Sequence, residues 1–170
     1  RDYDIEPDVS AACYFYALAA ATGKRAMVKR MRKESLQGDM KFISLLEKMG
    51  CTVSWECDGR QNLWLKGPDG KLKGMEVKMS DFSDQALTLA AIAPFADSEV
   101  TITGIAHIRG QESDRIKVIV DELAKMGILC NELPDGVKIH PGTPKNTNIE
   151  TYNDHRVAMS FAVTGLAGDG

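Results

Sequence analysis

The sequence predicts an α/β fold built from repeated βαβαββ units, and two internal similarities support this prediction. A Lys-Met-Gly triplet ends an apolar helical pattern twice, at 48–50 and at 125–127, with apolar residues at matching positions before both glycines. A hairpin pattern follows each triplet, at 51–66 and at 128–140. Such self-similarity indicates repeated supersecondary units, which bury their apolar faces by packing on one another.

The first unit, residues 1–70, is expected to run strand, helix, strand, helix and hairpin. Asp and Ser capping residues precede an Ala-rich helical pattern at 11–21. After a strand and a second helix, the hairpin turns around the Asp-Gly pair at 58–59. Trp55 and Trp64 are expected to face each other across this hairpin as a cross-strand pair.

The second unit, residues 71–145, has Asp and Ser capping residues before a helix expected over 84–93. Alternating β-formers then indicate a strand over 100–105. Apolar residues at i, i+3, i+4 and i+7 from Ile116 indicate another helix, which ends in a left-handed residue at Gly127.

A third unit occupies residues 146–170, where Asp154 takes the place of Asp84 before an apolar run, and it is expected to be truncated after its first helix. No Gly- or Ser-rich linker divides the chain, so residues 1–170 are expected to form one globular domain. The chain begins at Arg1 without Met and stops just after a helical pattern, which indicates a piece of a longer polypeptide.

The composition indicates a globular protein of the cytoplasm. A hydrophobic share of 44% suffices for a core, and a formal net charge of -3 indicates no polyanionic partner. The four cysteines form no CxxC pair and have no histidine at zinc-ligand spacing, so we expect reduced thiols and no metal site. No signal peptide or apolar run of membrane-spanning length is evident, and no membrane association is expected.

The densest charged stretch, residues 107–115, lies between a predicted strand and a predicted helix. Glu112 and Arg115 are three residues apart, so on a helix they would share one face and could contact one ligand together. The first N–H groups of that helix add positive potential. The stretch therefore suits an anionic substrate.

Three helix starts carry charged residues, and related repeats would bring these starts to one end of the domain. Arg115 and Arg156 would there bind an anion, and Asp84 and Glu112 would be carboxylates held beside it for proton transfer. A structural alternative stays open at this point. Asp84 and Asp154 would be ordinary helix caps, and Glu112 and Arg115 would form a surface ion pair.

The segment 24–33 holds six lysines and arginines, which raises the alternative of an RNA-binding or RNA-end-processing module. No aromatic residues are interleaved to stack on bases, and the chain is acidic overall. A solvated strand and turn is therefore favoured, and no nucleic acid partner is expected.

Four motifs, in this order, resemble the second half of the 5-enolpyruvylshikimate-3-phosphate synthase family. They are Ser-Leu-Gln-Gly-Asp at 35–39, Ser-Asp-Gln-Ala at 83–86, Arg-Gly-Gln-Glu-Ser-Asp-Arg at 109–115 and Tyr-Asn-Asp-His-Arg at 152–156. The resemblance implies one domain of a two-domain enzyme, folded as an inside-out α/β barrel of three βαβαββ units whose helix N-termini face the interdomain cleft. It also implies transfer of the enolpyruvyl group of phosphoenolpyruvate to the 5-hydroxyl of shikimate 3-phosphate. The transfer proceeds by addition and elimination, releases phosphate, and needs no metal or cofactor.

Residue by residue, the resemblance makes Asp84 the proton acceptor that contacts the shikimate hydroxyls. Glu112 resembles the acid that protonates the methylene of phosphoenolpyruvate. Arg115 and Arg156 resemble the pair that binds its carboxylate, and His155 resembles a residue that adjoins the phosphate region.

Two positions depart from the family pattern. Gln111 stands where members commonly have lysine, so one cation expected near shikimate 3-phosphate is replaced by a neutral amide. His107 stands where many members have asparagine. Either His107 supplies a shared charge, or other groups hold the substrate phosphate.

The N-terminal domain of the family, which supplies further substrate-binding residues, is expected to be missing from this chain. Because catalysis needs both walls of the cleft, the chain alone is expected to fold without turnover. The nearest rival is UDP-N-acetylglucosamine enolpyruvyl transferase, which shares the fold and the donor. The Gln-Glu-Ser-Asp-Arg and Asn-Asp-His-Arg motifs favour the shikimate enzyme.

Overall fold

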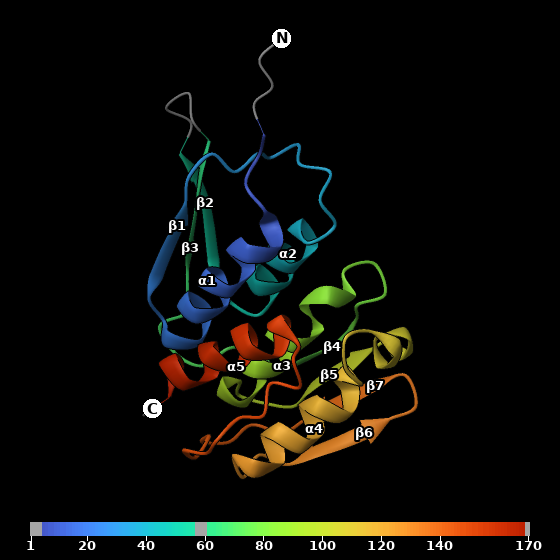
Figure 1. The fold of residues 1–170 in the computed structure, drawn as a ribbon. Coiled ribbons are helices and arrows are strands. Elements are labelled where there is room, and N and C mark those ends of the chain that lie inside the picture. The colour runs from blue at the N-terminus through green and yellow to red at the C-terminus, as the bar shows by residue number, and fades with distance from the viewer. Residues whose placement is uncertain (1–4, 57–60, 169–170) are drawn as a thin grey trace.

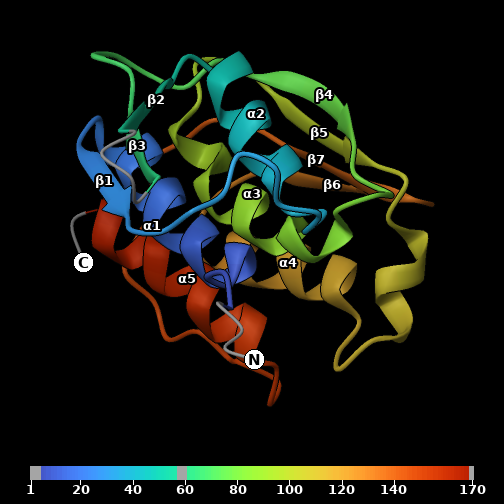
Figure 2. The same ribbon diagram turned by 90° about the horizontal axis from the view of Figure 1, so that it is seen from above.

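Three helices, α1, α3 and α5, contact one another at the centre of the molecule, with one β-sheet beside α1 and a second beside α4 (Figure 1). The computed structural model describes residues 5–56 and 61–168. Its helices are α1 (Val9–Thr22), α2 (Met40–Lys48), α3 (Ala86–Ile92), α4 (Arg115–Lys125) and α5 (His155–Ala167). Seen from above, α1, α3 and α5 lie next to one another (Figure 2). The predicted α/β class is confirmed.

The first sheet has three antiparallel strands in the order β1–β3–β2. Their bounds are β1 (Arg25–Val28), β2 (Thr52–Glu56) and β3 (Asn62–Lys66). The helix, strand, helix and hairpin expected after the first capping residues are therefore confirmed, although residues 5–8 form no strand. The Asp-Gly pair at 58–59 lies outside the described residues. The basic segment 24–33 forms β1 and the turn after it.

The predicted pairing of Trp55 with Trp64 is wrong. Trp55 lies opposite Leu63, and Trp64 lies opposite Ser54, so the two indoles point to opposite faces of the sheet. A register offset of one residue reverses the face on which a side chain lies. Each indole instead lies beside a cation. The Arg25 guanidinium is 4.6 Å from the ring centroid of Trp64.

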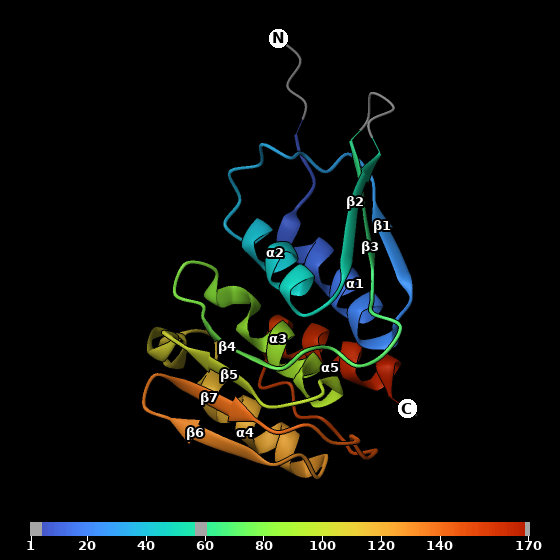
Figure 3. The same cartoon turned by 180° about the vertical axis from the view of Figure 1, so that it is seen from behind.

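The second sheet has four strands in the order β4–β5–β7–β6 (Figure 3). Their bounds are β4 (Met75–Lys78), β5 (Val100–Thr103), β6 (Cys130–Leu133) and β7 (Gly136–Ile139). β4 and β5 are parallel and are connected through α3, whereas β7 pairs antiparallel with both β5 and β6. The two sheets are separate, and the described residues form no closed barrel.

The two halves of the chain end their outer helices in the same way. Gly50 and Gly127 follow α2 and α4 with φ angles of 104° and 77°, a conformation that glycine adopts without steric penalty. The residue after each glycine donates its N–H to the carbonyl five residues earlier, which satisfies a helix-end acceptor. The predicted left-handed residue at Gly127 is thus confirmed.

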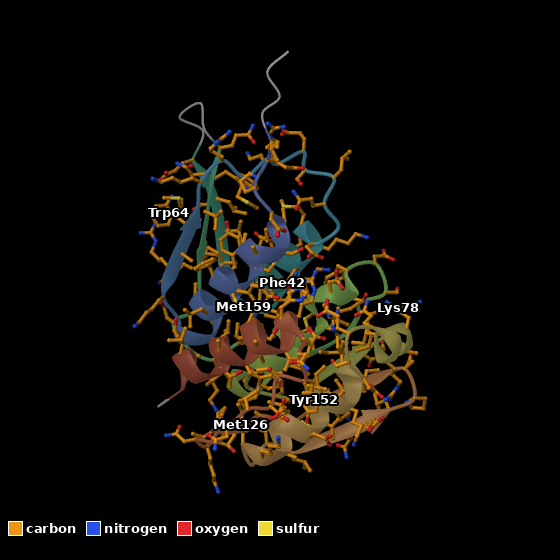
Figure 4. All side chains as sticks on the ribbon, in the orientation of Figure 1. Phe42, Trp64, Lys78, Met126, Tyr152 and Met159 are labelled. Carbon is orange, nitrogen blue, oxygen red and sulfur yellow. The ribbon has the colours of Figure 1, made fainter. Side chains whose placement is uncertain are left out.

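The third segment consists of an extended stretch followed by α5, and residues 146–153 form no strand. The central helices leave large apolar side chains exposed, namely Phe15 on α1 and Met159 and Leu166 on α5. Figure 4 labels Met159. Among the described helices, none combines the length and the apolar composition needed to cross a membrane.

Candidate active site

Side chains from three helix starts meet in one cluster. A short 3-10 helix, η1 (Ser83–Gln85), leads into α3. Asp114 is the N-cap of α4 and accepts the N–H of Lys117, and Asp154 is the N-cap of α5 and accepts the N–H of Arg156. Because these carboxylates satisfy N–H groups that a helix leaves free, they fix the residue at which α4 and α5 begin.

Arg115 and Asp154 form a buried ion pair within this cluster. Arg115 Nε lies 2.8 Å from Asp154 Oδ2, and its Nη2 lies 3.2 Å from Oδ1, which is a bidentate arrangement. The two side chains are 4% and 0% exposed. Burial raises the pKa of Asp154, but hydrogen bonds from Arg115, the Arg156 N–H and the Ser113 hydroxyl outweigh burial and hold this pKa below its usual value. Asp154 is therefore charged at neutral pH.

Asp84 bridges two arginines. Its Oδ2 lies 2.9 Å from Arg156 Nη2, and its Oδ1 lies 3.5 Å from Arg115 Nη1. Neither η1 nor α3 has a side-chain cap, so the alternative that Asp84 is a helix cap is wrong. The side chain of Asp84 is 42% exposed, which leaves its carboxylate accessible to a ligand.

Glu112 pairs with His155 rather than with Arg115. Glu112 Oε2 lies 3.0 Å from His155 Nδ1, and both side chains are exposed. The expectation that Glu112 and Arg115 share a helix face is wrong, because α4 begins at Arg115 and Glu112 precedes the Asp114 cap. The open alternative of a surface pair between them also fails, since Arg115 is buried.

The two positions that depart from the family pattern also join the cluster. Gln111 Oε1 accepts a hydrogen bond from Arg115 Nη1. His107 Nε2 lies 2.8 Å from the hydroxyl of Ser83, the residue before Asp84. The structure thus brings together all seven residues singled out from the sequence, which are His107, Gln111, Glu112, Arg115, His155, Arg156 and Asp84.

Sequence reasoning missed two supporting carboxylates. Asp154 was expected as a counterpart of Asp84 or as a helix cap, and its ion pair with Arg115, 39 residues away, has no local sequence signal. Asp39 ends the Ser-Leu-Gln-Gly-Asp motif, and its Oδ2 accepts hydrogen bonds from Ser10 Oγ at 2.5 Å and from Gln85 Nε2 at 2.7 Å. This motif therefore ties α1 to η1, next to the residue that meets the arginines.

The ligand atoms of Glu112, Asp154 and His155 lie within 4.8 Å of one another, which is close enough to consider a metal ion. Both oxygens of Asp154 already accept hydrogen bonds, and the positive charge of Arg115 lies against them. This donor set suits the ion pair better than a divalent cation, whose charge the arginine would repel.

The arrangement can bind an anion and move protons. Two guanidiniums point at the same exposed carboxylate of Asp84, and a planar carboxylate of a ligand matches guanidinium geometry. Glu112 offers a second exposed carboxyl group a short distance along the chain from Arg115. Two carboxylates beside an anion-binding pair are the equipment of acid–base chemistry on an anionic substrate.

Comparison with known proteins places the chain in a family. Residues 1–170 match the family model of EPSP synthase (3-phosphoshikimate 1-carboxyvinyltransferase). A 3-phosphoshikimate 1-carboxyvinyltransferase of Nostoc punctiforme is 49% identical over 166 residues, which are 98% of this chain and 38% of that protein. The 3-phosphoshikimate 1-carboxyvinyltransferase 2 of Halalkalibacterium halodurans is 47% identical and covers 97% of this chain and 37% of its own length.

A solved structure of EPSP synthase from Acinetobacter baumannii superposes with a TM-score of 0.81 at 30% sequence identity, covering 98% of this chain and 41% of that one. The chain thus spans less than half the length of the relatives that it matches. Their names favour neither the UDP-sugar transferase nor the RNA-binding alternative. The chain belongs to the EPSP synthase (3-phosphoshikimate 1-carboxyvinyltransferase) family.

Proposed function

We propose that this chain forms one wall of an active site that transfers the enolpyruvyl group of phosphoenolpyruvate to the 5-hydroxyl of shikimate 3-phosphate and releases phosphate. The observation that supports this proposal best is the cluster itself, in which two arginines and two exposed carboxylates from three helix starts converge. The opposite wall belongs to the N-terminal domain of the same polypeptide, and the proposal needs no cofactor.

In this proposal Arg115 and Arg156 bind the carboxylate of phosphoenolpyruvate. Because both guanidiniums now contact Asp84, the incoming carboxylate competes with Asp84 and releases it from its ion pairs. A carboxylate freed from guanidinium partners is a stronger base than a paired one. Asp84 can then accept the proton of the attacking 5-hydroxyl, while His107 and Gln111 contact shikimate 3-phosphate.

Glu112 acts as the acid that protonates the methylene of phosphoenolpyruvate. Its contact with His155 supports this role, because a hydrogen bond of 3.0 Å fixes the orientation of an otherwise exposed carboxyl group. A fixed carboxyl group delivers its proton along one direction, which general acid catalysis requires. In this proposal His155, held beside Glu112, lies close to the phosphate that leaves.

We further propose that residues 1–170 are a single domain, with units at about 1–70 and 71–145 and a truncated third unit at 146–170, and that the full domain is an inside-out barrel. The common order of β1–β3–β2 and β5–β7–β6 supports related units. The exposed apolar side chains of α1 and α5 are the surface that a third sheet would cover. A cytoplasmic location fits the free thiols of Cys13, Cys51 and Cys130.

This chain alone is expected to release no phosphate from phosphoenolpyruvate in the presence of shikimate 3-phosphate. Binding of phosphoenolpyruvate should be weak, since half of the groups that position the substrates are elsewhere in the polypeptide. A continuous phosphate assay on the purified chain measures this directly. Release of phosphate that depends on both substrates would contradict the division of the site between two domains.

The full-length protein is expected to consume phosphoenolpyruvate with shikimate 3-phosphate as acceptor, and not with UDP-N-acetylglucosamine. The measurement is phosphate release with each acceptor in parallel, with the Asp84→Asn variant as the control for site-dependent turnover. Turnover with the UDP-sugar alone would show that the acceptor assignment is wrong. Turnover with neither acceptor, together with RNA binding that falls with salt, would favour the RNA-binding alternative.

A further inference from the structure

We propose that Glu122 is a positioning residue for the active site. It holds the loop at residues 150–153 on α4, and this loop sets the direction in which the start of α5 presents His155 and Arg156. The claim about turnover rests on the proposed function, whereas the claim about the loop does not.

The loop before α5 has an unfavourable backbone conformation. Tyr152 and Asn153 both have φ angles of 54°, in the left-handed region. Non-glycine residues adopt this region at a steric cost, and a bulky aromatic residue does so rarely. Two consecutive residues of this kind persist only where surrounding contacts hold them. The start of α5 follows them directly, because Asp154 is its N-cap.

Glu122 supplies contacts that hold this loop. Its side chain is fully buried on α4. The hydroxyl of Tyr152 donates to Glu122 Oε1 at 2.8 Å, and the N–H of Glu150 donates to Oε2 at 3.2 Å. The hydrogen bond to Glu122, together with burial, raises the pKa of Tyr152 to about 12, so the hydroxyl remains a donor at physiological pH. Lys125 Nζ, 2.6 Å from Oε1, supplies the counter-charge of the buried carboxylate.

The loop is therefore attached to α4 at two places. Asp154 binds Arg115 in the first turn of α4, and Tyr152 binds Glu122 about two helical turns later. Tyr152 lies beside α4 (Figure 4). Because Glu150 and Tyr152 are held at one end and Asp154 at the other, the two attachments fix the path of residues 150–154, which include the left-handed pair. Loss of the Glu122 attachment lets these residues relax and turns the first residues of α5 away from Glu112 and Asp84.

The test compares Tyr152→Phe, Glu122→Gln and Glu122→Met in the full-length protein that contains this chain. Tyr152→Phe removes one hydroxyl, and Glu122→Gln keeps an acceptor for that hydroxyl. Glu122→Met removes the acceptors of both the Tyr152 hydroxyl and the Glu150 N–H, and it leaves the Arg115–Asp154 pair in place. Tyr16→Phe is the matched control, because the hydroxyl of buried Tyr16 makes one hydrogen bond to a carbonyl of β3. Two quantities are measured: hydrogen–deuterium exchange of the amides at 150–156, and kcat and KM for phosphoenolpyruvate.

We expect faster exchange at 150–156 in both Tyr152→Phe and Glu122→Met. The value of kcat/KM should fall about 10-fold in Tyr152→Phe and about 100-fold in Glu122→Met, as for displaced substrate-positioning groups. The exchange rate and kcat/KM of Glu122→Gln should lie between the values of these two variants and those of the wild type. Tyr16→Phe should change neither quantity. Unchanged exchange in Tyr152→Phe would overturn the claim about the loop, even if Glu122→Met fails to fold. Faster exchange with unchanged kcat/KM would overturn the positioning role. A wild-type protein without turnover would refute the proposed function, and exchange would still decide the claim about the loop.

Discussion

Replacement of Glu112 by Gln in the full-length protein is expected to lower kcat of the proposed reaction by about 100- to 10,000-fold, the usual contribution of a general acid or base. The amide keeps the shape of the side chain and can still contact His155, 3.0 Å from the present carboxylate, but it has no acidic proton to give. KM for phosphoenolpyruvate should change little, because the arginines that we propose to bind its carboxylate are intact. Steady-state phosphate release over a range of substrate concentrations separates the two constants.

Glu99→Gln is the matched control for this substitution. Glu99 also pairs with a histidine, with its Oε1 3.1 Å from His140 Nδ1, and its side chain is 46% exposed against 47% for Glu112. It lies directly before β5, outside the cluster, so its loss should leave kcat unchanged. An equal loss of activity in both variants, or a Glu112→Gln enzyme with wild-type kcat, would rule out Glu112 as the acid.

Arg115→Met is expected to lower the free energy of unfolding by about 3–5 kcal/mol, because it leaves the buried carboxylate of Asp154 without its cation. Arg115→Met combined with Asp154→Ser should recover much of this loss, since serine removes the charge and still caps the N-terminus of α5. Urea denaturation of the wild type and these two variants, monitored by the transition of this domain, measures the effect.

Arg109→Met provides the comparison for a partly exposed arginine. Arg109 pairs with Asp114 and Glu132 at distances of 3.3 and 2.7 Å, and it is more accessible to water than Arg115. Its loss should cost less than about 1 kcal/mol, as for most surface ion pairs. Equal effects of the two substitutions, or no recovery in the double variant, would mean that the Arg115–Asp154 pair does not stabilise the domain as described.

The elements with strong local signals could be predicted from the sequence. The ends of α2 and α4 were predictable because an apolar period of 3.6 stops at Gly50 and at Gly127, which tolerate positive φ angles. The register of the first hairpin was not predictable in the same way. Which residues face Trp55 and Trp64 depends on the length and geometry of the turn. A register shift of one residue moves every side chain of the strand to the opposite face of the sheet.

The candidate site was predictable as a set of residues, but only in part as a set of contacts. The main partner of Arg115 is Asp154, 39 residues away, and no local pattern encodes such a contact. The place of Glu112 was missed because Asp114, not a residue before Glu112, caps α4 and starts the helix after it. Where neighbouring residues can each cap a helix, the pattern alone leaves the helix start open by about two to four residues, which is enough to move a side chain off the helix.

The reaction of the full-length enzyme in D2O tests the proposed proton transfers most directly. In the proposed reaction, addition turns the methylene of phosphoenolpyruvate into a methyl group with one hydrogen from the solvent, and elimination removes one of the three hydrogens of that rotating group. Part of the product should therefore carry one deuterium in its methylene, as measured by mass spectrometry, and Glu112→Gln should slow its formation. A product without deuterium would contradict protonation of the methylene, and with it the role assigned to Glu112.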